Sequence, residues 1–296
     1  MMEKALPGVA GGDVARIRSE YRIRGLTPQV ISHFRDVVCS HYWSQGRDLP
    51  WRKTNDPYHI LVSEFMLQQT RVERVQHYYP RFLERFPDFS ALASATLSEV
   101  LQEWKGLGYN RRALALRDTA RRVCGGYDGI LPSEEPILRS LPGIGRATAA
   151  AICAFAFNQP AMLLETNIRT VFIYCFFWDR QGVKDSDILP LLKDTIPLRS
   201  AREWYYALMD YGVSVKKREG NLTRQTHSYR SQPRFVDSDR QIRGRILTQL
   251  MLHSRQREEE IQEGLGIPTL RIHRLLTTLK REGFLRREGE SWLLMH

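Results

Sequence analysis

The sequence has few cysteines and no long apolar run. Its four cysteines, Cys39, Cys124, Cys153 and Cys175, lie far apart without a Cys-x2-Cys pair, and its histidines form no i, i+4 pair. Local pairs of this kind build most zinc and iron-sulfur sites, so we expect no metal and reduced, buried thiols. No run reaches the roughly 18 apolar residues of a membrane span, and the N-terminus lacks a signal-peptide core. We therefore expect a cytoplasmic protein that has no contact with membranes.

Positive charge is in excess along the chain. The 296 residues include 44 Lys and Arg against 33 Asp and Glu, which gives a net charge of +11. Such a charge favours a polyanionic partner such as nucleic acid, although it also serves solubility. The length allows one large or two modest domains with a sizeable core.

Residues 138–152 predict two helices joined by a glycine turn. Leu138 and Leu141 close one helical segment, and an alanine-rich segment follows Gly143, Ile144 and Gly145. The two glycines indicate a backbone that approaches another group closely, beside the free N–H groups of a helix N-terminus that can bind phosphate. An ordinary helical hairpin that turns on glycine fits the same residues. The stretch alone leaves both interpretations open.

A carboxylate interrupts the apolar stripe of an earlier helix. Asp56 is the natural N-cap and Pro57 the first residue of this helix. Glu64 follows Leu61 by three residues and precedes Leu67 by three, so it projects from the apolar side. Three explanations stay open: an acid at the edge of the surface, a buried partner of an arginine, or a functional acid whose pKa is raised by desolvation.

The rest of the chain divides into a lead-in, further helices, a linker and a separate C-terminal pattern. Residues 1–26 read as loosely ordered and 216–236 as a basic linker or strap. In the polar segment at 165–167, which starts a helix, Thr166 is the better cap. Residues 237–296 predict three helices and a hairpin that turns at 288–290, the order of a winged-helix domain. The other predicted helices are 27–43, 72–86, 96–106, 111–124, 134–140, 168–178, 189–195 and 201–212.

Several motifs occur in an order that resembles a known family. They are RDLPWR at 47–52, DPY at 56–58, SEFMLQQT at 63–70, GLGY at 106–109, LPGIG at 141–145, and Asn167. Together they resemble the catalytic domain of the adenine DNA glycosylases, which belong to the helix-hairpin-helix superfamily. The resemblance covers roughly 28–215. It implies a mainly α, two-subdomain helix-hairpin-helix glycosylase fold at 27–215, here followed by the winged-helix domain.

The resemblance implies a reaction at two carboxylates. Glu64 would protonate the departing adenine, because the neutral base leaves poorly as an anion. A second acid stabilises or attacks the oxocarbenium-like sugar. The family has an Asp two residues before the position of Asn167, where this chain has Glu165. Glu165 is therefore either a longer catalytic acid or a cap of its helix. By the resemblance, the catalytic set contains Glu64, Glu165 and Asn167. Ala147 stands where strand-cutting relatives carry a lysine, so we expect a glycosylase without lyase activity.

Further residues are expected to contact the extruded base or the duplex. By resemblance, the base pocket contains Arg47, Leu49, Trp51, Arg52 and Asp210. Tyr109 is expected as a wedge in the gap that extrusion leaves, against the alternative of a core aromatic. The full set expected to contact DNA is Gln68, Gln69, Thr70, Tyr109, Gly143, Ile144, Gly145, Arg146 and Thr148.

Two features of the family are missing from this sequence. No cysteines follow Tyr211, where relatives hold an iron-sulfur cluster, so we expect none, and the usual C-terminal module that recognises 8-oxoguanine is absent. We expect a monomeric, nucleoid-associated enzyme that excises mispaired adenine from double-stranded DNA. The alternatives are a glycosylase for another base, such as thymine or uracil opposite guanine, and a non-catalytic DNA-binding protein.

Overall fold

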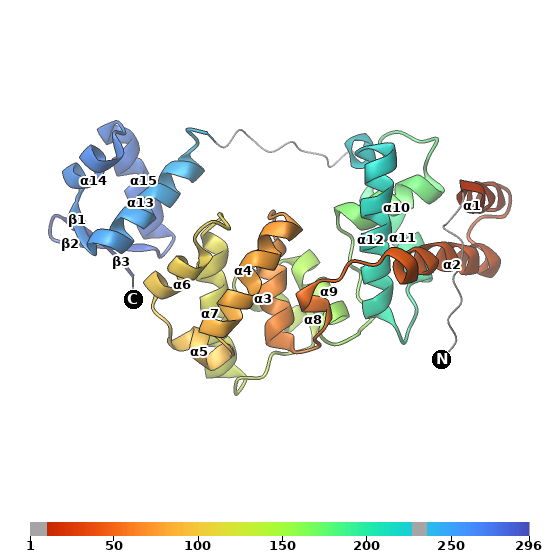
Figure 1. Cartoon of the computed structure of the whole chain (residues 1–296), viewed down its shortest axis with the longest axis horizontal. Coiled ribbons are helices and arrows are strands. Elements are labelled where there is room, and N and C mark those ends of the chain that lie inside the picture. Colours follow the sequence, from red (N-terminus) through yellow and green to blue (C-terminus); the bar gives the residue numbers. More distant parts are fainter. Residues whose placement is uncertain (1–10, 227–235, 296) are drawn as a thin grey trace. The chain divides into compact units, whose positions relative to one another are not determined.

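The computed structural model describes residues 11–226 and 236–295, and these residues are mainly helical, as the sequence predicts (Figure 1). The chain forms two compact units. The first contains 1–60, 133–139 and 144–231, and the second contains 61–132, 140–143 and 232–296. No helix in the described ranges is both long and apolar enough to cross a membrane.

The first unit has an aromatic core. The ring of Phe34 lies edge-on to those of Phe172, Phe176 and Trp204, at centroid distances of 5.4, 5.0 and 5.6 Å. These side chains bring together α2, α10 and α12, which lie close to one another in Figure 1. The elements of this unit are α1 (Gly11–Arg24), α2 (Pro28–Gln45), η1 (Pro50–Arg52), α8 (Glu135–Ser140), α9 (Arg146–Phe155), α10 (Thr166–Phe176), α11 (Asp185–Thr195), α12 (Ala201–Glu219) and η2 (Leu222–Gln225).

The second unit packs its helices around Phe82 and Trp104. Their ring centroids are 5.8 Å apart, and the indole N–H of Trp104 donates to the carbonyl oxygen of Gly108 at 3.0 Å. The hydrogen bond ties the loop after α6 to the core. The helices are α3 (Pro57–Leu67, in this unit from residue 61 on), α4 (Val72–Arg85), α5 (Phe89–Ser94), α6 (Leu97–Trp104) and α7 (Arg111–Gly126).

The C-terminal part of this unit has the three helices and the hairpin that the sequence predicts. Its elements are α13 (Asp239–His253), β1 (Arg255–Arg257), α14 (Glu258–Leu265), α15 (Thr269–Arg281), β2 (Leu285–Glu288) and β3 (Ser291–Leu294). Trp292 of β3 pairs with Gln256 and Arg287, so β3 is the middle strand of an antiparallel sheet. The strand β1 was not predicted. That this domain works as a winged helix stays a prediction.

Two predicted segments are corrected by the structure. Residues 1–26 are not loosely ordered throughout, because α1 forms and buries Val14 and Ile17. Arg18 of α1 also donates to the carbonyl oxygen of Tyr174 at 2.7 Å. The linker predicted at 216–236 begins later, because α12 continues to Glu219 and η2 follows. The remainder of that linker falls at 227–235, outside the described residues.

Candidate active site and DNA interface

Glu64 lies in the second half of α3, a helix whose other side chains are mostly buried. Oδ1 of Asp56 accepts a hydrogen bond from the backbone N–H of Tyr58 at 2.8 Å, which confirms the predicted start of this helix. Leu61 and Phe65 are fully buried, whereas Glu64 is half-buried. The carboxyl group is therefore at the border between the core and solvent. Its catalytic role stays a prediction.

The segment that follows α3 turns sharply and contacts a buried arginine. Gln69 has a φ of 56°, in the left-handed region that residues other than glycine rarely adopt. Arg112, in the first turn of α7, donates to acceptors at the end of α3. These are the carbonyl oxygens of Phe65, Met66 and Gln68 at 2.8, 2.8 and 2.5 Å and Oγ1 of Thr70 at 3.0 Å. The predicted DNA contacts at 68–70 are thus fixed to α7.

The predicted wedge residue, Tyr109, also has a left-handed backbone. Its φ is 50°, it follows Gly108 with a φ of 73°, and its side chain is partly exposed, unlike a core aromatic. The guanidinium groups of Arg112 and Arg240 lie 5.5 and 4.9 Å from its ring centroid, and Arg240 donates a hydrogen bond to its hydroxyl. Two cations therefore hold this ring. Its insertion into DNA stays a prediction.

The first glycine of the hairpin is required by close packing. Gly143 has a φ of 72°, and a Cβ on it would lie 2.7 Å from Cβ of Ala115 and 2.9 Å from the ring of Phe65. Oγ1 of Thr119 donates to the carbonyl oxygen of Pro142 at 2.8 Å. The turn is thus packed against α7 and against the residue that follows Glu64.

The second glycine leaves open space. Gly145 is the N-cap of α9, has a φ of −84°, and no atom lies within 4 Å of the position that its Cβ would take. Gly145 offers no side-chain oxygen to cap α9, and a helix N-terminus of this kind can bind an anion. Ile144 is buried, Arg146 is exposed and Thr148 is half-buried. Phosphate binding by these residues stays a prediction.

Glu165, not Thr166, caps α10. Its Oε1 accepts a hydrogen bond from the backbone N–H of Ile168 at 2.8 Å, and Asn167 donates from Nδ2 to Oε2 at 3.3 Å. The prediction of a Thr166 cap is wrong, because the longer side chain of Glu165 accepts the hydrogen bond from the N–H of Ile168. Desolvation raises the pKa of the Glu165 carboxyl above its usual range, against the backbone hydrogen bonds and the charges of Arg169 and Arg47, which lower it.

Gly212 of α12 lets the site segment lie close to its neighbour. A Cβ on Gly212 would lie 2.4 Å from the carbonyl oxygen and 2.8 Å from the Cβ of Asn167. Only a glycine permits this approach of α12 to the first turn of α10. The sequence gives no pattern that reveals this contact.

Asp210 is the centre of a buried ion-pair cluster. Its carboxylate accepts from the backbone N–H and Nε of Arg47 at 2.8 and 2.6 Å and from Nη1 and Nη2 of Arg52 at 2.8 Å each. Burial opposes ionisation, but the bonds from both arginines outweigh it and lower the pKa of Asp210. The guanidinium of Arg52 also lies 4.6 Å from the ring centroid of Tyr206. The cluster fastens the 47–52 segment to α12.

The other predicted pocket residues are buried in this segment. Leu49 is 5% and Trp51 4% exposed, and the side chain of Arg52 is 6% exposed. Arg47, Arg52 and Asp210 therefore form an ordinary ion-pair cluster. Contact of Arg47, Leu49, Trp51, Arg52 and Asp210 with a base stays a prediction.

The cysteines do not fit an iron-sulfur cluster. They are free, and they lie on α2, α7, α9 and α10. Burial raises the pKa of Cys39 and Cys153 to about 11 and that of Cys175 to about 12. Within the described ranges, no three His, Cys, Asp or Glu side chains gather into a metal site. A cluster of four thiolates has no donor set here.

The basic residues of α15 mostly contact acids. Oδ1 of Asp239 accepts from Arg271 at 2.9 Å and Oδ2 accepts from Arg274 at 2.6 Å, while Nδ1 of His273 lies 3.2 Å from Glu258. Such surface pairs are weak and open readily to a phosphate.

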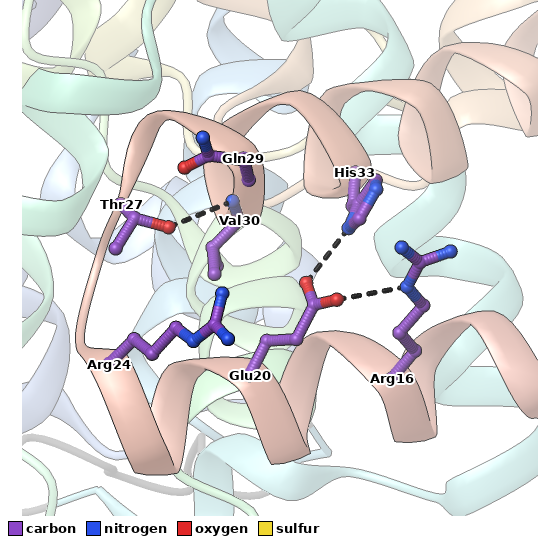
Figure 2. A pocket seen from close by; sticks show the side chains of 7 residues that line it. All are labelled: Arg16, Glu20, Arg24, Thr27, Gln29, Val30 and His33. Atoms are coloured by element: carbon purple, nitrogen blue, oxygen red, sulfur yellow. Dashed lines mark hydrogen bonds and ion pairs between the residues drawn. The ribbon is translucent and has the colours of Figure 1, made fainter.

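A cavity of about 210 Å³ opens beside α1 and α2, and none of the residues that line it is a predicted site residue (Figure 2). Its lining includes the Glu20 carboxylate, which lies 2.9 Å from Nε of Arg16 and 2.8 Å from Nδ1 of His33. The other lining residues are Arg24, Thr27, Gln29 and Val30.

The fold and the hairpin define a class of DNA-repair protein. Residues 62–192 match the HhH-GPD superfamily of base excision DNA repair proteins. The chain is 28% identical to a thermostable thymine-DNA glycosylase of known structure, with a TM-score of 0.57 over 62% of this chain and 85% of that one. A trapped endonuclease III–DNA intermediate has the same fold, at 22% identity and a TM-score of 0.52 over 63% of this chain and 86% of that one.

Sequence relatives narrow this class. The adenine DNA glycosylase of Mycobacterium tuberculosis H37Rv is 35% identical over 241 residues, which cover 73% of this chain and 78% of the relative. The adenine DNA glycosylase of Mycolicibacterium smegmatis is 34% identical over 228 residues, which cover 71% of this chain and 78% of the relative. The chain therefore belongs to the adenine DNA glycosylase family of the HhH-GPD superfamily.

Replacing Asp210 with Asn should destabilise the protein by about 3 to 5 kcal/mol, because Arg52 stays buried without its carboxylate. The folded pKa of Asp210 is lowered, so its stabilisation is complete above the unfolded pKa of about 3.9 and is lost as the pH falls through the folded value. Urea unfolding at several pH values should therefore show a flatter acid decline for the variant. Asp48→Asn, at an exposed pair with Lys53, is the control and should match the parent. Equal stability of Asp210→Asn and parent would contradict this role.

Gly143→Ala and Gly145→Ala should separate packing from DNA contact. The first meets Ala115 and Phe65 and forces alanine to a positive φ, which alone costs about 1 to 2 kcal/mol, so its Tm should fall. The second should stay within about 1 kcal/mol of the parent in stability yet bind duplex more weakly if phosphate approaches this backbone. Calorimetry and fluorescence anisotropy measure the two effects. Unchanged affinity of Gly145→Ala would refute the phosphate contact.

Proposed function

We propose that this protein hydrolyses the N-glycosidic bond of a mispaired adenine extruded from duplex DNA, as a step of base excision repair. The proposal rests on the position of Glu64. This residue is half-buried on α3 and lies one helical turn before the sharp bend of the chain at Gln68 and Gln69. An acid there can meet a base that has left the stack beside those glutamines.

In the proposed reaction Glu64 donates a proton to the adenine, and the base then leaves as a neutral molecule. The role requires the protonated form of Glu64 when DNA is bound, and a base seated against α3 would displace the remaining water from it. Positive charge grows on the sugar as the bond breaks. Water completes the hydrolysis.

Glu165 is proposed as the carboxylate that stabilises this positive charge. Its hydrogen bond from the N–H of Ile168 fixes the position of the group and favours the ionised form, against the burial that raises its pKa. Capping and catalysis are compatible, since the two carboxylate oxygens can serve different partners. The backbone at Asn167, two residues after Glu165, packs closely against Gly212.

The proposal includes three further features. Ala147 is exposed in the first turn of α9 and offers no amine for a Schiff base, so the product would be an intact strand with an abasic site. Cysteines in a suitable arrangement are lacking, so the enzyme would work without an iron-sulfur cluster. We also propose that it acts as a monomer on mismatched DNA of the nucleoid.

A second candidate is excision of thymine or uracil opposite guanine. The observation in its favour is the likeness to the thermostable thymine-DNA glycosylase. Glu165 in place of the aspartate expected from the family resemblance also suits a different substrate.

A panel of duplexes tests both candidates. Adenine opposite 8-oxoguanine or guanine should lose its base, revealed by alkaline cleavage, while thymine or uracil opposite guanine should remain intact. Glu64→Gln should slow adenine release by about 10²- to 10⁴-fold with duplex affinity nearly unchanged. Release from the pyrimidine duplexes alone would establish the second candidate instead. Strand cleavage before alkali would contradict the assignment of Ala147.

Substitution of Glu165 tests its charge separately from its capping role. Glu165→Gln keeps an oxygen for the N–H of Ile168 but loses the charge, so kcat should fall by about 10²- to 10³-fold with a small change in Tm. Glu165→Asp should retain most activity. The neighbouring exposed Thr166→Ala is the control and should match the parent in both measurements. A parent-like kcat for Glu165→Gln would reduce Glu165 to a cap.

A further inference from the structure

Arg112 is a buried cation whose partners are unusual. Arg112 is 7% exposed, and no acceptor among the described residues bonds its Nε. Besides the end of α3, its Nη2 donates to the carbonyl oxygens of Leu107 and Gly108 at 3.2 and 3.0 Å. Every hydrogen-bond acceptor found for it in the described part of the chain is a carbonyl or a hydroxyl oxygen, none a carboxylate. The charge is therefore buried without an opposite charge bonded to it.

Burying this charge is costly in free energy. Desolvation lowers the pKa of Arg112 to about 10. The carbonyl groups at the end of a helix carry partial negative charge and lack partners inside the helix, so they compensate a cation. A planar guanidinium has five N–H donors in a fixed fork that can span two segments, whereas an ammonium group has three donors on a single atom.

The guanidinium joins two segments that are distant in sequence. One is the end of α3 with Gln68 and Gln69, and the other is the loop of Leu107 and Gly108 that carries Tyr109. Gln69 and Tyr109 both have positive φ, at 56° and 50°. Strained backbone of this kind persists only where surrounding contacts hold it, and it gathers at functional sites.

We propose that Arg112 is a positioning residue for base extrusion: it fixes the spacing between the Gln68–Gln69 turn and Tyr109 so that both enter the duplex together. The inference rests on the proposed function, since it takes these residues as the groups that fill the gap. Arg112 itself touches neither base nor sugar. It acts through the two segments that it holds.

A matched control is available on the same helix. Arg117 is 3% exposed, and its nearest acid, Asp118, lies 3.6 Å away. No hydrogen bond links it to the end of α3 or to the loop of Tyr109 within the described ranges. Loss of a buried guanidinium alone would affect both arginines in the same way.

The experiment compares Arg112→Lys with Arg117→Lys on two substrates. One is a duplex with adenine opposite guanine, and the other carries adenine opposite an abasic-site analogue, where less pairing resists extrusion. Single-turnover base release gives the rate. 2-Aminopurine at the target position reports extrusion by its fluorescence.

Arg112→Lys should slow release from the mismatch by about a hundredfold, the effect of a misplacement near 1 Å, and should lose the fluorescence rise. On the abasic-site duplex it should recover to within a few-fold of the parent. Arg117→Lys should show the same ratio to the parent on both duplexes. Should Arg112→Lys fail to fold by circular dichroism, Thr70→Val, which removes one acceptor of Arg112, should show the same difference between substrates at smaller size.

Equal slowing of Arg112→Lys on both duplexes, or parent-like rates on both, overturns the proposal. A substrate-dependent defect in Arg117→Lys also overturns it. If the parent releases no base yet raises the fluorescence, and Arg112→Lys does not, positioning is supported while the proposed reaction fails. The two ideas therefore fail by different results.

Discussion

One face of α7 holds the segments of the second unit that are expected to meet DNA. Arg112, Ala115 and Thr119 follow one another at helical spacing and contact the end of α3, the turn at Gly143 and the carbonyl oxygen of Pro142. The three contacts differ in kind. Arg112 donates hydrogen bonds from its guanidinium, Ala115 packs against a glycine, and Thr119 donates from its hydroxyl. A shift of this helix would move the glutamine turn, the Tyr109 loop and the hairpin together.

The two acids of the proposed reaction are held by different physical means. Glu64 is placed by the apolar packing of α3, whose capping by Asp56 sets the phase of the helix. Glu165 is placed by its own hydrogen bond to the first turn of α10. An acid that must give up a proton and a carboxylate that must be charged need unlike surroundings. At Glu165 the hydrogen bond from Ile168 favours the charged form, while burial raises the pKa and opposes it.

The sequence predicted the elements whose causes are local. The cap at Asp56, the glycine turn at 143–145 and the hairpin at 288–290 depend on neighbouring residues, so their patterns were sufficient. The helix α1 was missed because few of its side chains are apolar, and its burial depends on α10. Thr166 was preferred as a cap over Glu165 on propensity, which the reach of the longer side chain overrode.

The site could be predicted as a set of residue types but not as an arrangement. Arg112 contacts acceptors more than forty positions earlier, and Gly212 meets Asn167 from another helix. Neither contact has a periodicity or a local spacing that a sequence displays. The base-pocket residues show the same limit, since the Asp210 cluster joins Arg52 to a residue 158 positions later in the sequence.

The cysteines have a consequence for the chemical durability of the protein. Oxidants and alkylating agents attack thiolates, and a thiol with a pKa near 11 or 12 is almost wholly protonated in the cell. Cys153 and Cys175 are in addition shut away from solvent. Oxidants and alkylating agents should therefore modify Cys153 and Cys175 slowly while the protein is folded.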